Sequence, residues 1–141
     1  MSSLFDQQAM ARALQLARRG RYSTSPNPRV GCVIARDDQV LAEGWHQWAG
    51  EGHAEVNALG QLDSAAGCTA YVTLEPCSHY GRTPPCAEAL IKSGVARVVV
   101  AMQDPNPQVA GRGLAMLREA GIAVDCGLLE ADARALNRGF S

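Results

Sequence analysis

The stretch "CTAYVTLEPCSHYGRTPPCAEALIKSGVARVVVAM", residues 68–102, decides the fold class of this chain. Two β-rich runs, at 68–74 and 95–102, flank a segment at 84–92 whose paired prolines are typical of the start of a helix. A strand–helix–strand unit of this kind is the building block of parallel sheets. We therefore predict an α/β layer fold.

The rest of the chain continues the alternation. We expect helices at about 6–19, 53–62, 113–120 and 130–138, a further strand at 122–129, and a hairpin at 30–46 that turns at Asp37 and Asp38. The later strands should be parallel and buried. The 141 residues, of which 47% are hydrophobic, are enough for a single packed core. We predict one domain over residues 1–141.

Composition and charge exclude several classes of partner. The chain has 13 basic and 14 acidic residues, so it offers no broad attraction to nucleic acid or anionic lipid. Its apolar runs fall short of the roughly 20 residues of a membrane helix, and the first residues lack the features of a signal peptide. We expect a cytoplasmic protein that binds neither nucleic acid nor membrane. The apolar content is compatible with a homo-oligomer, but no motif sets the number of chains.

The five cysteines divide into two groups. Cys32, Cys68 and Cys126 lie in apolar, strand-like runs and are expected to be small core residues. Cys77 and Cys86 enclose eight residues and have three explanations: a disulfide, a zinc clip, or packing. A reducing compartment disfavours the disulfide.

A zinc site is favoured by the neighbouring motif "GEGHAEVNALG". His53, Cys77 and Cys86 supply the three protein ligands of a catalytic zinc, whose fourth position is open to water. Glu55 is not needed as a ligand and suits proton transfer. The pattern is similar to the His-x-Glu and Pro-Cys-x-x-Cys signature of zinc deaminases, although eight residues rather than two separate the cysteines here. A closed structural site with His79 as the fourth ligand is the alternative.

Four blocks resemble the deaminase domains of the RibD-type riboflavin biosynthesis family, within the cytidine deaminase-like superfamily: "NPRVGCVI", "GEGHAEVNAL", "AYVTLEPCSHYGRTPPCAEALI" and "AMQDPNPQVAGRGLAMLREAGI". The likeness spans nearly the whole chain, and the long cysteine spacing is specific to this family. It implies a three-layer α/β/α sandwich with a central mixed sheet. It also implies one zinc per chain and hydrolysis of 2,5-diamino-6-ribosylamino-4(3H)-pyrimidinone 5′-phosphate, with release of ammonia and formation of the pyrimidinedione.

The resemblance also implies roles for individual residues. The metal ligands and the proton shuttle are those named above. Positions that line the substrate pocket in the family are matched by Asn27, His46, His79, Arg82, Asp104 and Asn106. Arg82 offers a fork that suits the phosphate of the ribotide. Taken without the family, His46 is equally well explained as a structural histidine, and Asn27 and Asp104 as residues that cap turns.

Other functions stay open at this stage. Members of the family usually continue into an NADPH-dependent reductase domain after a segment like "LNRGF", whereas this sequence ends at Ser141, so we expect the deaminase activity alone. A deaminase for another base, a nucleoside or tRNA is one alternative, and a non-catalytic, zinc-stabilised binding module is another. The first would not require the phosphate of the substrate. The second would need a fourth protein ligand on the metal.

Overall fold

The computed structural model describes residues 2–20, 28–47, 52–81 and 83–137. All the predicted helices and strands are present, with ends displaced by a few residues. In chain order they are α1 (Leu4–Arg18), β1 (Gly31–Arg36), β2 (Gln39–Trp45), α2 (Ala54–Leu59), β3 (Thr69–Val72), α3 (Cys86–Ser93), β4 (Arg97–Val100), α4 (Arg112–Glu119), β5 (Ala123–Cys126) and α5 (Glu130–Leu136).

The strands form one mixed sheet in the order β2-β1-β3-β4-β5. β1 pairs antiparallel with β2 and with β3, while β3, β4 and β5 run parallel. The β1–β2 hairpin turns at Asp37 and Asp38, whose φ angles of 52° and 60° are left-handed. Two successive left-handed residues match the twist of a two-residue hairpin, and aspartate tolerates that conformation. The predicted hairpin and mixed sheet are confirmed.

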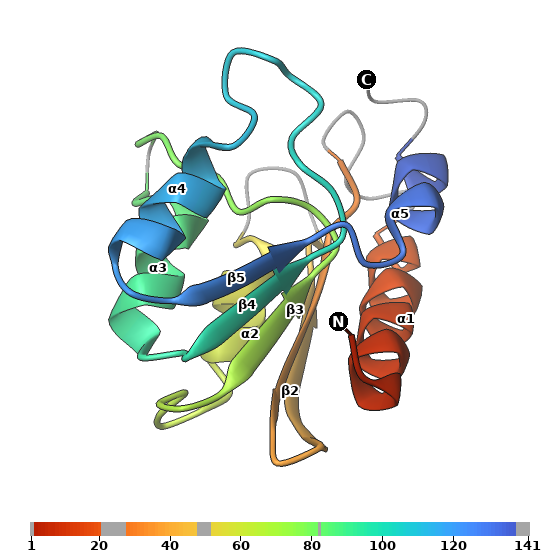
Figure 1. The fold of residues 1–141 in the computed structure, drawn as a ribbon, viewed down its shortest axis with the longest axis vertical. Helices are drawn as coiled ribbons and strands as arrows, with labels where there is room; N and C mark the ends of the chain where they lie inside the picture. Colours follow the sequence, from red (N-terminus) through yellow and green to blue (C-terminus); the bar gives the residue numbers. More distant parts are fainter. Residues whose placement is uncertain (1, 21–27, 48–51, 82, 138–141) are drawn as a thin grey trace.

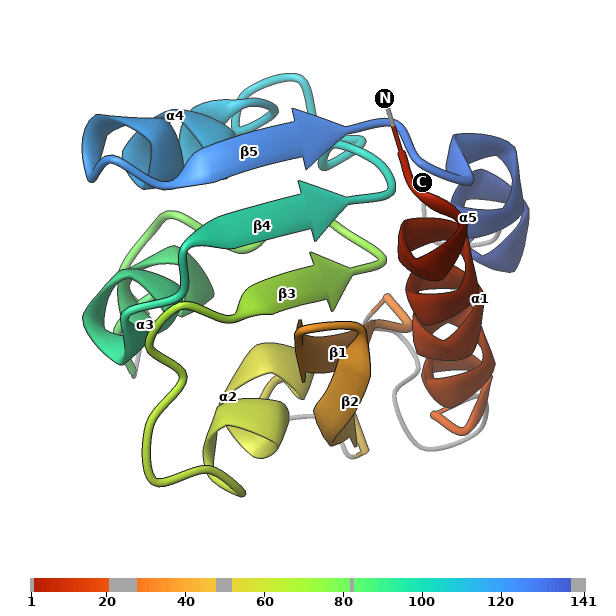
Figure 2. The same ribbon diagram turned by 60° about the horizontal axis from the view of Figure 1, so that its bottom comes forward.

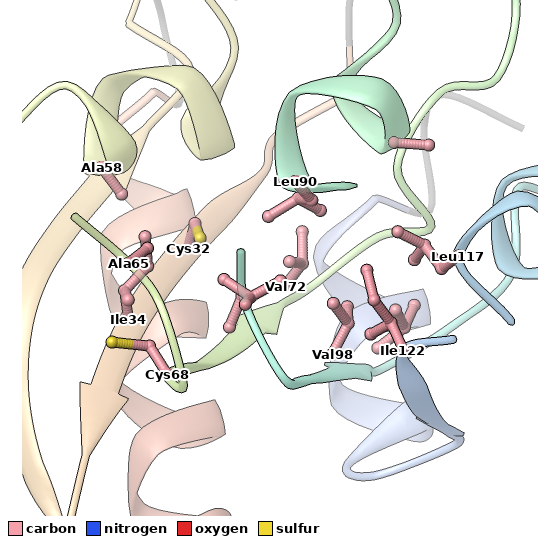
Figure 3. Packing of buried hydrophobic residues seen from close by; sticks show 14 of the residues in the cluster. Cys32, Ile34, Ala58, Ala65, Cys68, Val72, Leu90, Val98, Leu117 and Ile122 are labelled. Carbon is pink, nitrogen blue, oxygen red and sulfur yellow. The ribbon is translucent and has the colours of Figure 1, made fainter. Parts of the chain in front are cut away.

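Helices cover both faces of the sheet, which gives three layers (Figures 1 and 2). α1 and α5 lie on one face, and α2, α3 and α4 lie on the other. Successive residues of β1 alternate between the two cores: Cys32 and Ile34 join the cluster under α2–α4, and Val33 joins the cluster under α1. Figure 3 shows part of the first cluster, which includes Val72, Leu90 and Leu117. The predicted three-layer α/β/α sandwich is confirmed.

Two glycines let helices approach the sheet closely. A Cβ added to Gly31 would lie 1.9 Å from the carbonyl oxygen of Ala13, so α1 packs directly on the backbone of β1. A Cβ added to Gly44 would lie 2.5 Å from the carbonyl oxygen of Ala54 and 2.7 Å from the amide nitrogen of Ala58. The second contact fixes the beginning of α2, which follows directly after His53.

One expectation about burial is wrong. β5 is parallel to β4 as predicted, but most of its residues are exposed because it is the last strand of the sheet and has a neighbour on one side only. Cys126 is accordingly exposed and is not a core residue, whereas Cys32 and Cys68 are buried as expected. Among the helices that the structure describes, none is long and apolar enough to cross a membrane.

Candidate active site

Three segments meet at the candidate metal site. His53 is the N-cap of α2, Cys77 lies in the loop after β3, and Cys86 is the first residue of α3. Pro85 precedes Cys86 with a φ of −65° and a ψ of 152°, the extended conformation of an N-cap, so the prediction that the two prolines lead into a helix is confirmed. Each candidate ligand thus lies where a helix begins or a strand has ended.

The geometry of the three side chains fits a metal ion. The Nδ1 atom of His53 lies 3.0 Å from Sγ of Cys86 and 3.9 Å from Sγ of Cys77, and the three ligand atoms all lie within 4.8 Å of one another. Ligands at about 2.0–2.3 Å from a tetrahedral zinc are themselves roughly 3.5–4 Å apart. One imidazole with two thiols is also a ligand set that zinc prefers. The side chains can therefore hold the predicted zinc.

The two thiols form a coupled pair. All five cysteines are free, which excludes the disulfide. A hydrogen bond from the Cys86 thiol, with further bonds from His53 and from the Cys86 backbone N–H at 3.1 Å, lowers the pKa of Cys77 to about 4. The same hydrogen bond, together with burial, raises the pKa of Cys86. The hydrogen bonds therefore favour the thiolate form of Cys77, which is the form that binds a metal, and binding of a metal would release the proton of Cys86.

Glu55 lies beside these ligands but is not one of the three residues that form the metal-binding group. Its side chain is buried, with 3% of the residue exposed. Burial raises the pKa of Glu55 to about 7, although the positive charge of His53 opposes the shift. A carboxyl group with a pKa near neutrality can both accept and release a proton at physiological pH. This environment is suited to the proton transfer predicted for Glu55.

His46 is placed next to the metal ligands. Its ring centre lies 5.4 Å from that of His53, and its Nε2 atom is buried with no hydrogen-bond partner among the described residues. Burial, and then the neighbouring charge of His53, lowers the pKa of His46. A buried ring nitrogen ordinarily has a hydrogen-bond partner, and Nε2 of His46 has none among the residues that the structure describes.

The structure describes some of the remaining predicted pocket residues and not others. Asn27 and Arg82 lie outside the described residues. His79 is exposed in the loop between Cys77 and Cys86 and does not belong to the metal-binding group, so the closed structural site with His79 gains no support. The side chain of Asp104 accepts a hydrogen bond from the N–H of Asn106, and that of Asn106 accepts one from the N–H of Gln108. The turn-capping role considered for Asp104 is therefore present.

Sequence reasoning missed Glu75. This residue is 5% exposed, and its carboxylate accepts hydrogen bonds from four backbone N–H groups. The available signal was an acidic residue between Leu74 and Pro76, directly after an apolar strand.

Asn137 was also missed: its side-chain amide pairs with both the N–H and the carbonyl group of Arg29.

Comparisons with known proteins agree on one family. A profile described as "Cytidine and deoxycytidylate deaminase zinc-binding region" matches residues 3–102. Riboflavin biosynthesis protein RibD of Escherichia coli (strain K12) is 64% identical over 136 residues, which are 96% of this chain and 37% of that protein. Diaminohydroxyphosphoribosylamino-pyrimidine deaminase of Buchnera aphidicola subsp. Schizaphis graminum is 49% identical over 93% of this chain and 90% of its own length.

The solved structure of Acinetobacter baumannii RibD superposes with a TM-score of 0.94 at 60% identity. The match covers 96% of this chain and 38% of that one. The chain therefore spans well under half the length of these RibD proteins, and most of the length of the Buchnera deaminase.

Proposed function

The chain belongs to the cytidine and deoxycytidylate deaminase zinc-binding family, and we propose that it is a zinc-dependent hydrolase that deaminates the diaminopyrimidinone ribotide of riboflavin biosynthesis. The observation that supports this most directly is the position of Glu55. This residue is buried beside the His53–Cys77–Cys86 group but is not part of that group. The substrate is inferred from relatives such as the Buchnera deaminase, whose name states that reaction and whose length this chain nearly matches.

The reaction replaces the 2-amino group of the ring by oxygen. When bound, zinc would supply the Lewis acidity that makes hydroxide available from water at neutral pH. Glu55 accepts the proton that the attacking water loses and passes it to the adjacent ring nitrogen. It then transfers the second proton of the water to the departing amine, which leaves as ammonia. The pKa of about 7 that burial gives Glu55 suits a group that must both take up and release protons.

Binding of the ribotide is assigned to Asn27, His46, His79, Arg82, Asp104 and Asn106. Three observations support this assignment. The buried Nε2 atom of His46 has no hydrogen-bond partner among the described residues, and the ring lies beside that of His53. In the sequence, His79 and Arg82 lie between Cys77 and Cys86, two of the three residues of the metal-binding group. The hydroxyl group of Tyr80 donates to Glu88 on α3, which anchors the middle of that segment.

The decisive experiment is an ammonia-release assay with the ribotide beside cytidine, guanine and adenosine. Loss of a general acid–base typically lowers kcat by about 10²- to 10⁴-fold. We expect Glu55→Gln to show a loss of this size and to keep one zinc per chain by metal analysis. Glu119→Gln, on the exposed face of α4, should behave as the wild type. Zinc loss in Glu55→Gln would refute the separation of the shuttle from the ligands.

A second assay separates this substrate from other bases and nucleosides. Arg82→Ala should raise KM for the ribotide far more than for its dephosphorylated form, because the guanidinium is assigned to the phosphate. Equal effects would favour a different base, nucleoside or tRNA. A metal spectrum with four protein ligands would favour a binding module. Location in the cytoplasm, association into oligomers and attachment to a reductase domain stay predictions.

A further inference from the structure

Glu75 joins two segments of the candidate active site. It lies two residues before Cys77, after the end of β3, and is buried. Its Oε1 atom accepts hydrogen bonds from the backbone N–H groups of Asp104 and Gly111, both at 3.0 Å. Its Oε2 atom accepts from Gly113 at 2.9 Å and Leu114 at 3.2 Å. One side chain therefore bonds both ends of the loop at residues 104–111 and the first turn of α4.

The carboxylate of Glu75 caps the beginning of α4, which has no N-cap side chain of its own. The N-cap of α4 is Gly111, which has no side chain to accept the first N–H groups, and the first turn contains no acidic residue. A helix start leaves these N–H groups unpaired and favours a negative charge nearby. Glu75 supplies both the acceptors and the charge from a distant segment, so the position of α4 depends on the loop that contains Cys77.

Two backbone contacts hold the same segments together. The N–H of Glu75 donates to the carbonyl of Met102 at 2.9 Å, just before the 104–111 loop. A Cβ added to Gly113 would lie 2.1 Å from the carbonyl oxygen of Pro76, so the first turn of α4 rests directly on the residue before Cys77. These contacts fix the start of α4 against the segment that leads into Cys77.

The 104–111 loop has an internal structure of its own. It connects β4 to α4 and projects beyond the sheet (Figure 1). Asp104 accepts from the N–H of Asn106 at 2.9 Å, Asn106 accepts from the N–H of Gln108 at 3.0 Å, and the carbonyl of Asn106 accepts from the N–H of Ala110 at 2.9 Å. These hydrogen bonds fix the shape of the loop from within, and its orientation is set where its ends are held. Both ends are held by Glu75.

We infer that Glu75 is a positioning residue that holds the 104–111 loop, with Asp104 and Asn106, in a fixed position relative to the segment that contains Cys77. The inference rests on the proposed function, because it assigns these two residues to substrate binding. Glu75 is not one of the residues of the metal-binding group. It acts through the backbone of the loop, and its loss should weaken substrate binding more than it slows the chemical step.

Glu75→Gln tests the inference with little change in size. A carboxamide has one acceptor oxygen and one NH₂ donor, so two of the four backbone N–H groups would lose their acceptor. We expect KM for the ribotide to rise about tenfold or more and kcat to change less than about threefold, with one zinc still bound per chain. Hydrogen exchange of the amides at residues 104–114 should accelerate. If Glu75→Gln does not fold, Glu75→Asp, which withdraws the carboxylate by one methylene, is measured in the same way.

Asp6→Asn is the matched control. Asp6 is another buried acid whose carboxylate is hydrogen-bonded, but it is paired with Arg97 at the beginning of β4, whereas the 104–111 loop follows the end of that strand. A purely structural loss in either variant would lower the active fraction without raising KM. Faster exchange at 104–114 with a raised KM in Glu75→Gln alone supports the inference. An unchanged KM overturns it, whether or not exchange accelerates. A zinc-loaded wild type that releases no ammonia would refute the proposed function instead. Hydrogen exchange would still test the inference in that case, because an unchanged exchange rate at residues 104–114 in Glu75→Gln would show that Glu75 does not hold the loop.

Discussion

Replacing Asp6 by Asn is expected to lower the free energy of unfolding by about 2–2.5 kcal/mol at pH 7. Asp6 is 4% exposed on α1 and links the N-terminal helix to the sheet. Its carboxylate accepts from the hydroxyl of Tyr71 at 2.6 Å, from two nitrogens of Arg97 at 3.0 and 2.9 Å, and from the N–H of Ser3 at 3.1 Å. An amide at this position keeps one acceptor oxygen and turns an NH₂ group toward the other donors.

The magnitude follows from which bonds are lost. Charge-assisted hydrogen bonds contribute about 1.5–3 kcal/mol each when well buried. The side chain of Arg97 is 29% exposed and keeps its ion pair with Asp125 at 2.9 Å. Loss of the hydrogen bonds between Arg97 and Asp6 therefore costs an amount at the low end of this range, near 1.5 kcal/mol. The weakened capping box between Ser3 and Asp6 adds about 0.5–1 kcal/mol. A total of about 2–2.5 kcal/mol corresponds to a Tm lower by roughly 6–12 °C for a domain of this size.

The loss should depend on pH in a defined direction. The bond to Arg97 holds the pKa of Asp6 well below its ordinary value of 3.8. The unfolded chain therefore binds the proton first on acidification, and the contribution of Asp6 is complete above about pH 4 and declines as the pH falls below it. The gap between wild type and Asp6→Asn should be full at pH 7 and smaller at pH 3.

Urea unfolding followed by circular dichroism at the two pH values measures both quantities. The matched control is Asp125→Asn, which removes the other partner of Arg97; the side chain of Asp125 is 60% exposed, and its loss should cost less than about 1 kcal/mol. A gap below about 1 kcal/mol for Asp6→Asn at pH 7 would contradict the assignment of Asp6 as a buried anchor. So would a gap of equal size at both pH values.

Two further perturbations concern the metal and the packing beneath it. Removing zinc with a chelator should abolish ammonia release and lower Tm, because a metal that binds the folded chain stabilises it by mass action. Cys77→Ala should likewise abolish ammonia release and lower Tm. Cys126→Ala, which replaces an exposed thiol, should leave both ammonia release and Tm unchanged. Gly44→Ala should destabilise the protein by about 1–3 kcal/mol or more and reduce activity, since its Cβ would meet the backbone of Ala54 and push α2 off the sheet. Normal stability and activity in Gly44→Ala would show that α2 relaxes without moving His53.

The elements of the fold could be predicted because their patterns are local. The run at 95–102 and the paired prolines before Cys86 each determine structure within a few residues of themselves. Exposure of β5 could not be predicted in this way. The segment is apolar enough for a central strand, and its place at the edge follows from how many parallel strands the whole chain supplies. Cys126 was misplaced for the same reason, since its burial depends on a neighbouring strand that does not exist among the described residues.

The candidate site shows the same division between local and distant information. His53, Cys77 and Cys86 could be found because zinc selects side-chain types, and those types stand out in the sequence at helix starts and strand ends. Glu75 could not, because its four partners are backbone N–H groups, which every residue except proline possesses. No pairing of residue types therefore marks the bond between Glu75 and Gly113. Besides the acidic residue that follows an apolar strand, the trace in the sequence is an absence of side chains: Gly111 and Gly113 leave the start of α4 uncapped and close enough to Pro76 for a carboxylate from another segment to reach it.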